Sequence, residues 1–289
     1  MATMSAVFSR LIRFQNPAGL IFYGEAGDTA ISAESLYGKT VPTYQGQWPW
    51  QDDFALSGDE ETVAKMLSPL PSVPIFYGVG LNYRSHAKEA TVKSGSDKHP
   101  LVFTKPPDAL AGPLDDIPFS EALLNMDYEG ELCIVIGKDL KNFTQGDDPS
   151  PYILGYTVGN DVSSRFWQKP EQSGGQHAIA KSFDKFAPIG PVIASTTAIS
   201  DPANLTLETF VNGERRQKAS TGELVFNLST ILEFVSRGVT VRPGTVIMTG
   251  TPAGVAASFR PQDKWLKDGD VVEVSISEIG SIKNKYVLE

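Results

Sequence analysis

Cysteine and long apolar runs are scarce in this chain of 289 residues. The single cysteine, Cys133, excludes an intramolecular disulfide and favours a reducing compartment. No apolar stretch reaches the ~20 residues that a membrane-spanning helix needs, and the N-terminus lacks the apolar core of a secretory signal. We therefore expect a cytoplasmic protein with no membrane partner. Arg10 and Arg13 precede the first acidic residue, Glu25, which leaves mitochondrial import as the alternative.

A surplus of basic residues is also missing, because 34 acidic residues outnumber 25 basic ones and give a net charge of −9. Binding to nucleic-acid phosphates or anionic membrane surfaces depends on clustered positive charge, so neither is an expected partner. The sequence has no internal repeat and no low-complexity tract. No P-loop or G-x-G-x-x-G spacing occurs between a predicted strand and a predicted helix. Apolar residues (41%) suffice for a core, and 26 glycines with 20 prolines predict many short strands joined by turns.

A proline-rich segment, residues 68–74, is the best candidate for a domain boundary. We expect a small N-terminal β-rich module at residues 1–70 and a larger, catalytic domain at residues 71–289. The predicted elements of the module are two strands, an irregular polar stretch and a short helix, at residues 7–14, 19–23, 44–50 and 60–67.

Strands also dominate the larger domain, so the predicted fold class is α+β and mainly β. Strands, some with their following turns, are expected at residues 74–83, 101–105, 127–137, 152–158, 205–211, 214–219, 243–252 and 271–276 and near residue 286. Short helices are expected at residues 84–90, 165–168 and 228–237. Residues 172–176 form a polar loop that is a candidate lid, and His177 is read as a further polar loop residue.

The segment 127–137 carries two glutamates at the start of a buried apolar strand. Residues two apart on a strand project to the same face, so Glu129 and Glu131 lie side by side, and Gly130 keeps the opposite face clear. Adjacent carboxylates beside a core repel each other unless a cation or a shared proton lies between them. Oxygen ligands favour a hard divalent cation such as Mg²⁺, Mn²⁺ or Ca²⁺. A solvated strand end with two surface acids fits the same spacing.

Two further patterns add candidate site groups. Asp161 ends the next predicted strand, where a third carboxylate can converge on the glutamate pair. His86 and Glu89 are three apart and share a face if residues 84–90 form a helix. A carboxylate beside an imidazole fixes its tautomer and raises its basicity, which suits a general base. An ordinary pair on a helix surface is the alternative explanation of that spacing.

Five motifs, taken in order, resemble the fumarylacetoacetate hydrolase family. They are G-L-N-Y-R-S-H-A-K-E (80–89), D-Y-E-G-E-L (127–132), G-N-D-V-S (159–163), K-S-F-D (181–184) and T-G-T-P-A-G-V (249–255). The likeness spans about residues 74–289, and the preceding residues look like the variable module of many members. The resemblance implies a mixed β-sandwich roll with short helices, which is usually dimeric, so a homodimer is expected.

The resemblance also implies roles for particular residues. The residues that match the family's metal-binding carboxylates, with Mg²⁺ or Mn²⁺ as expected cofactor and Ca²⁺ as a further option, are Glu129, Glu131 and Asp161. His86 and Glu89 match the catalytic dyad on a lid-like segment, and Lys181 matches the lysine that faces the substrate. The candidate substrate-binding residues are Arg84, Arg165, Gln168 and Thr251. Together with Lys105, the arginines and Lys181 supply local positive charge for an anionic substrate.

The activity expected from the resemblance is metal-dependent chemistry on a small anionic 2-oxo or β-diketo acid. The leading expectation is hydrolysis of a C–C bond in an acylpyruvate or fumarylacetoacetate-like acid. In that reaction His86 activates water, Lys181 stabilises the oxyanion, and an enolate held by the metal is released. The same enolate serves decarboxylation or tautomerisation of oxaloacetate, so a lyase or isomerase is the alternative. A non-catalytic binding protein that retains the fold is the third hypothesis.

Overall fold

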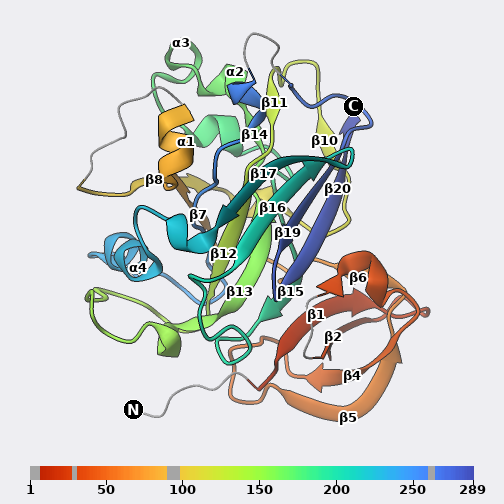
Figure 1. Ribbon diagram of the computed structural model, residues 1–289. Helices are drawn as coiled ribbons and strands as arrows, with labels where there is room; N and C mark the ends of the chain where they lie inside the picture. Colours follow the sequence, from red (N-terminus) through yellow and green to blue (C-terminus); the bar gives the residue numbers. More distant parts are fainter. Residues whose placement is uncertain (1–6, 28–30, 90–97, 260–263) are drawn as a thin grey trace.

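The computed structural model describes residues 7–27, 31–89, 98–259 and 264–289. Strands dominate it and the helices are short, which confirms the expected mainly β class (Figure 1). The helices are α1 (Arg84–Glu89), α2 (Arg165–Gln168), α3 (Pro170–Ser173) and α4 (Leu228–Ser236). Among the described residues, no helix is both long and apolar enough to cross a membrane.

One large mixed sheet runs from the N-terminal strands through the body of the protein. Its spatial order is β5 (Ala55–Thr62), β4 (Thr40–Gln45), β2 (Ile21–Glu25), β1 (Arg10–Gln15), β15 (Ala187–Ala194), β13 (Ile153–Asn160), β12 (Gly130–Ile136), β18 (Val246–Met248), β7 (Phe76–Gly80) and β8 (Leu101–Lys105). Off this path, β6 (Lys65–Leu67) pairs with β1 and β9 (Leu110–Ala111) pairs with β15. Because β1 hydrogen-bonds to β15, the N-terminal strands continue the sheet of the larger domain. The division near residue 70 therefore stays a prediction.

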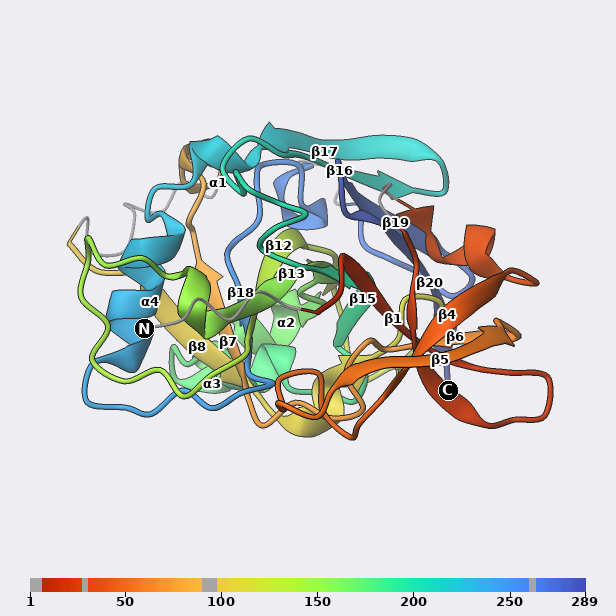
Figure 2. The same cartoon turned by 90° about the horizontal axis from the view of Figure 1, so that it is seen from below.

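A second sheet packs over the middle of the first, as the turned view in Figure 2 shows. Its order is β10 (Ile117–Phe119), β20 (Gly280–Leu288), β19 (Val271–Ile276), β16 (Thr206–Val211) and β17 (Glu214–Ser220), with β3 (Ile31–Ser32) paired to β20. A short pair joins β11 (Met126–Asp127) to β14 (Ser163–Ser164). The apolar residues Leu132 and Ile134 of β12 belong to the core that also contains Val274 of the second sheet. Cys133 and Val135 belong to a second apolar cluster, so β12 is buried on both faces.

Most predicted elements are present, and the strands predicted at residues 205–211 and 214–219 pair as a hairpin whose turn has left-handed backbone at Asn212 (φ 50°) and Gly213 (φ 80°). The predicted helix at residues 60–67 is wrong, because this stretch belongs to β5 and β6. The backbone of β5 pairs with β4 in a hairpin at the edge of the sheet, where polar side chains face solvent and no apolar alternation marks a strand. The stretch 44–50 is irregular only in part, since its first two residues end β4.

Candidate metal centre and active site

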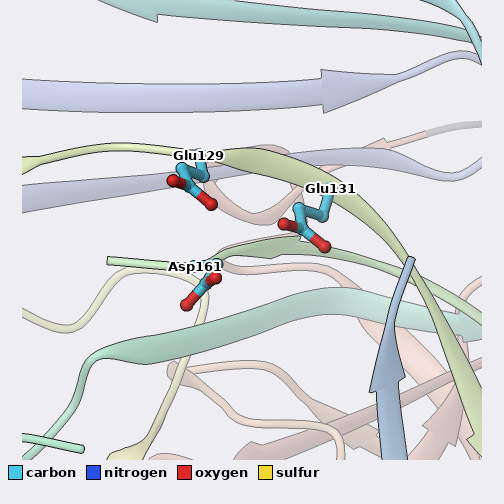
Figure 3. Close-up of side chains that lie close together, drawn as sticks. All are labelled: Glu129, Glu131 and Asp161. Atoms are coloured by element: carbon cyan, nitrogen blue, oxygen red, sulfur yellow. The ribbon is translucent and has the colours of Figure 1, made fainter. Parts of the chain in front are cut away.

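Strand pairing brings three carboxylates together. β12 and β13 are antiparallel with Gly130 opposite Asn160, and the Asp161 N–H donates to the Glu129 carbonyl (2.8 Å). Asp161 therefore leaves β13 beside the start of β12. One oxygen from each of Glu129, Glu131 and Asp161 lies within 4.8 Å of the others, and all three residues are buried. Figure 3 shows the three carboxylates gathered on one side of β12.

The residue between the two glutamates packs against the second sheet. A Cβ atom at Gly130 would lie 2.3 Å from Thr209 Oγ1 and 2.9 Å from Val274 Cγ1. The Gly130 N–H donates to Gln217 Oε1 (3.0 Å). The face opposite the carboxylates is thus closed by protein, and only glycine fits there.

Buried basic side chains compensate two of the three carboxylates. Lys181 Nζ donates to Glu129 Oε2 (3.1 Å) and to Asp161 Oδ2, and Arg165 Nη2 donates to Glu129 Oε1. Lys105 donates to Asp161 Oδ1 (2.5 Å). Burial opposes ionisation of Glu129, but Lys181 and Arg165 outweigh it and lower its pKa. Burial likewise opposes the charge of Lys181, but Asp161 and Glu129 raise its pKa, so the ammonium form is kept.

Glu131 has the least compensation of the three. Its Oε2 accepts a hydrogen bond from the Gly250 N–H (2.6 Å), and no basic side chain of the described residues forms an ion pair with it. Burial, and then the charges of Asp161 and Glu129, raise the pKa of Glu131 well above its ordinary value. A divalent cation would remove this repulsion because it can bind all three carboxylates at once. The donor set therefore fits a hard divalent ion such as Mg²⁺ or Mn²⁺.

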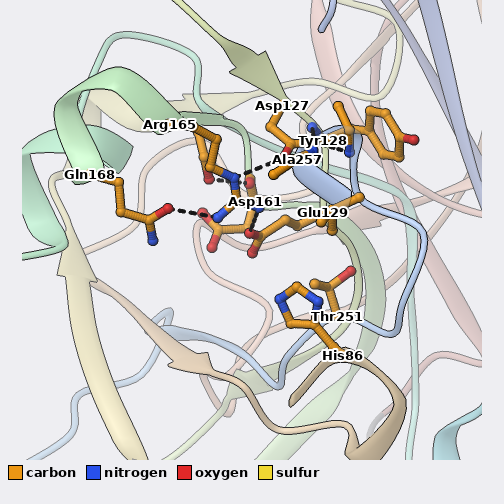
Figure 4. A network of polar contacts seen from close by, with 12 residues as sticks. His86, Asp127, Tyr128, Glu129, Asp161, Arg165, Gln168, Thr251 and Ala257 are labelled. Carbon is orange, nitrogen blue, oxygen red and sulfur yellow. Dashed lines mark hydrogen bonds and ion pairs between the residues drawn. The ribbon is translucent and has the colours of Figure 1, made fainter. Parts of the chain in front are cut away.

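Arg165 is held by three side chains, which Figure 4 shows around its guanidinium. Its Nε donates to Asp127 Oδ2 (2.7 Å), its Nη1 donates to Gln168 Oε1 (2.7 Å), and its Nη2 pairs with Glu129. Asp127 is fully buried and also accepts the Ala256 N–H on Oδ1 (2.7 Å). One carboxylate thus fixes both the arginine and the loop that follows β18.

The predicted pair His86 and Glu89 lies on α1. His86 Nδ1 is 3.3 Å from Glu89 Oε2, and the His86 side chain is buried. Glu89 also accepts the Gly254 N–H on Oε1 (3.0 Å). Burial opposes ionisation of Glu89, but hydrogen bonds from His86 and other donors, Gly254 among them, lower its pKa. Figure 4 shows the His86 ring beside Thr251, on the same side as the carboxylate cluster.

The remaining predicted substrate-binding residues are placed differently from Arg165 and Gln168. Thr251 Oγ1 donates to the Gly130 carbonyl (2.9 Å) and accepts from Gln217 Nε2 (2.8 Å), so its hydroxyl is engaged within the protein. Arg84 is exposed at the start of α1. Substrate contact by these residues stays a prediction.

Sequence patterns assigned no site role to Asp127 and Gln217, and they assigned a different role to Lys105. Asp127 adjoins the two-glutamate motif, and that position is its only local signal. Lys105 was expected to attract substrate, whereas its ammonium is buried and bound to protein groups. Gln217 is 87 residues from Gly130 in the chain, so no local pattern predicts their contact.

His177 is a loop residue, as predicted, and its loop borders the site. Its ring centroid is 6.5 Å from that of Phe103, and the Lys181 ammonium lies 4.7 Å from the same Phe103 ring. Burial, and then the Lys181 charge, lower the pKa of His177. A second imidazole is therefore present at the rim of the carboxylate cluster.

The family profile described as "Fumarylacetoacetate (FAA) hydrolase C-terminal" matches residues 75–287. The chain belongs to the fumarylacetoacetate hydrolase family. This confirms the family predicted from the five motifs, and it places the chain in a family of enzymes that includes hydrolases and isomerases.

Individual members show the range of reactions in this family. The chain is 39% identical over 222 residues to "Oxaloacetate tautomerase fahd2, mitochondrial" of Xenopus laevis, covering 77% of this chain and 68% of that protein. It resembles the crystal structure of 2-hydroxyhepta-2,4-diene-1,7-dioate isomerase from Mycobacterium marinum (TM-score 0.79, 31% identity, 97% and 99% coverage). It also resembles fumarylpyruvate hydrolase from Pseudomonas aeruginosa in complex with Mn²⁺ and pyruvate (TM-score 0.67, 28% identity, 75% and 91% coverage).

Proposed function

We propose that this member of the fumarylacetoacetate hydrolase family is a divalent-metal-dependent oxaloacetate tautomerase. The observation that carries the proposal is the 39% identity to an oxaloacetate tautomerase over 77% of the chain. The sequence motifs by themselves favoured C–C hydrolysis and held tautomerisation as an alternative. The same set of side chains serves either reaction, so the motifs do not choose between them. Tautomerisation is placed first here because of the identity to an oxaloacetate tautomerase.

The binding half of the site supplies charge of both signs. Glu129, Glu131 and Asp161 would hold the ion, and a bound divalent ion supplies Lewis-acid polarisation of the 2-oxo group of the substrate. Arg165 and Lys181 add fixed positive charge beside these carboxylates. Once a divalent ion is bound, that charge favours an acid with negative carboxylates over a neutral ketone.

The acid–base half of the site is the His86–Glu89 pair. If Nδ1–H is donated to Glu89, Nε2 of His86 carries the lone pair that accepts a proton. In the keto-to-enol direction, His86 takes a proton from C3, and the electron pair of that C–H bond forms the C2–C3 double bond. His86 then gives a proton to the oxygen on C2. No water is consumed and no C–C bond breaks, so the pair returns to its starting state.

Hydrolysis of a β-diketo acid is the second candidate, supported by the likeness to fumarylpyruvate hydrolase. In this case His86 would deprotonate water for attack on the distal carbonyl, and Lys181 would stabilise the developing oxyanion. Cleavage would release pyruvate or a related 2-oxo acid. The two candidates therefore differ in product, although they share residues.

The deciding experiment follows the enol absorbance of oxaloacetate with purified protein and Mn²⁺, with and without EDTA. We expect acceleration of tautomerisation that EDTA abolishes, and no pyruvate by NMR beyond the buffer rate. His86→Gln should lower the rate by about 10²-fold or more, whereas His99→Gln, at an exposed histidine, should leave it unchanged. No acceleration by the wild type would refute the proposal. Pyruvate release from an acylpyruvate in the same preparation would establish the second candidate instead.

A further inference from the structure

Lys105 is a buried basic residue beside the carboxylate cluster that the proposed reaction does not use. It ends β8, and only 1% of it is exposed. Its Nζ donates to Asp161 Oδ1 (2.5 Å), to the Val162 carbonyl (3.3 Å) and to the Phe186 carbonyl. An ammonium group has three N–H donors, so these acceptors use all of them. Lys105 has no donor left for a substrate.

The two oxygens of Asp161 are divided between two lysines. Oδ1 is bound by Lys105, and Oδ2 is bound by Lys181. Lys181 also reaches Glu129 Oε2 (3.1 Å), so Oδ2 is the oxygen on the side of the other carboxylates. Lys105 thus holds the Asp161 oxygen that Lys181 does not contact.

We propose that Lys105 is a positioning residue that holds Asp161 Oδ1 and thereby turns Oδ2 toward the proposed metal site. The inference rests on the metal binding by Glu129, Glu131 and Asp161 that is part of the proposed function. A carboxylate can rotate about its Cβ–Cγ bond and can bind a metal through one oxygen or two. The buried Lys105 ammonium is itself fixed by the Val162 and Phe186 carbonyls, so its hydrogen bond to Asp161 Oδ1 removes that freedom. Outer hydrogen-bond partners of this kind typically change metal affinity by about 10–100-fold when they are removed.

A charge role and a positioning role for Lys105 predict opposite changes in metal affinity when the lysine is removed. If the lysine acted only through its positive charge, its removal would make the cluster more negative and would tighten binding of a divalent cation. If it acts by positioning Asp161, its removal weakens binding in spite of that extra attraction. The direction of the change in affinity therefore separates the two roles, which a loss of activity could not do.

The test measures Mn²⁺ binding to the full chain by calorimetry and by electron paramagnetic resonance of the bound ion. Lys105→Met should raise the Kd at least about 10-fold and change the spectrum of the bound ion. Lys105→Gln, which keeps a hydrogen-bond donor without the charge, should fall between Lys105→Met and wild type. Lys138→Met, at an exposed lysine after the far end of β12, should bind as wild type does.

Unchanged or tighter Mn²⁺ binding by folded Lys105→Met would overturn the proposal. If that variant does not fold, as judged by circular dichroism, Lys105→Gln decides in the same way, and unchanged or tighter binding again overturns it. Absence of Mn²⁺ binding by wild-type protein is a different failure. It would remove the proposed metal site itself, and the positioning role of Lys105 with it.

Discussion

Replacement of Asp127 by asparagine should lower the free energy of unfolding by about 3 kcal/mol. The substitution keeps the shape of the side chain and removes its charge. One amide oxygen can still accept the Ala256 N–H, as Oδ1 does now (2.7 Å). The amide NH₂ must then face Arg165 Nε–H and the Ala257 N–H, which now donate to Oδ2 (2.7 and 3.2 Å). The amide N–H groups would then face the N–H groups of Arg165 and Ala257, and residue 127 is fully buried, so water could not separate them.

The size of the effect follows from what Arg165 keeps. Breaking a buried ion pair costs about 3–5 kcal/mol when the remaining charge has no partner. Arg165 still has Glu129 and Gln168, so its charge remains compensated and the expected loss lies at the low end of that range.

The chain provides a matched control for this substitution. Asp139 pairs with Arg242 (2.6 Å), and the two side chains are 52% and 64% exposed. An exposed pair contributes about 0–1 kcal/mol, so Asp139→Asn should have little effect. Urea denaturation of both variants, compared by midpoint and slope, measures the difference. Equal losses in the two variants would refute the view that Asp127 anchors the site.

Three further predictions concern other parts of the site. Because the pKa of Glu89 is lowered from 4.5, its ionised form stabilises the fold above that value, and this contribution is lost as pH falls through the lowered value. The difference in unfolding free energy between wild type and Glu89→Gln should therefore shrink below about pH 4.5, and a constant difference from pH titration of denaturation would contradict this. Because the pKa of Glu131 is raised above its ordinary value, protons compete with metal, so the rise in Tm caused by Mn²⁺ should grow as the pH increases. A rise independent of pH would argue against Glu131 as a ligand. Gly130→Ala should lose about 1–3 kcal/mol in urea denaturation through the clash with Thr209 (2.3 Å), and Thr209→Ala should restore part of it. No recovery in the double variant would show that the clash lies elsewhere.

The parts of the site that were predictable from sequence depend on local geometry or on motif order. Strand periodicity placed Glu129 and Glu131 on one face, and helical spacing placed His86 beside Glu89. The convergence of Asp161 needed the order of the motifs, because it depends on how β12 pairs with β13. Each of these features rests on residues that are near in the chain or on strands consecutive in the sheet.

The parts that were missed depend on contacts between distant segments. Lys105 and Asp161 are 56 residues apart, and the pairing of their segments is set by the whole sheet. The error at residues 60–67 has a related cause, since the edge strand β5 is specified by its backbone partner β4 more than by its own side chains. A polar edge strand and a polar helix have similar composition, and only the partner distinguishes them.

The charges of the site bear on how an acidic chain would bind the anionic substrate proposed above. The buried carboxylates of the site are Asp127, Glu129, Glu131 and Asp161, and the buried cations paired with them are Lys105, Arg165 and Lys181. The carboxylates exceed the cations by one, and the excess falls on Glu131, which has no basic partner among the described residues. A divalent ion would turn this single negative excess into a single positive one. The cluster would then attract anions only after the ion is bound, so metal should bind before substrate.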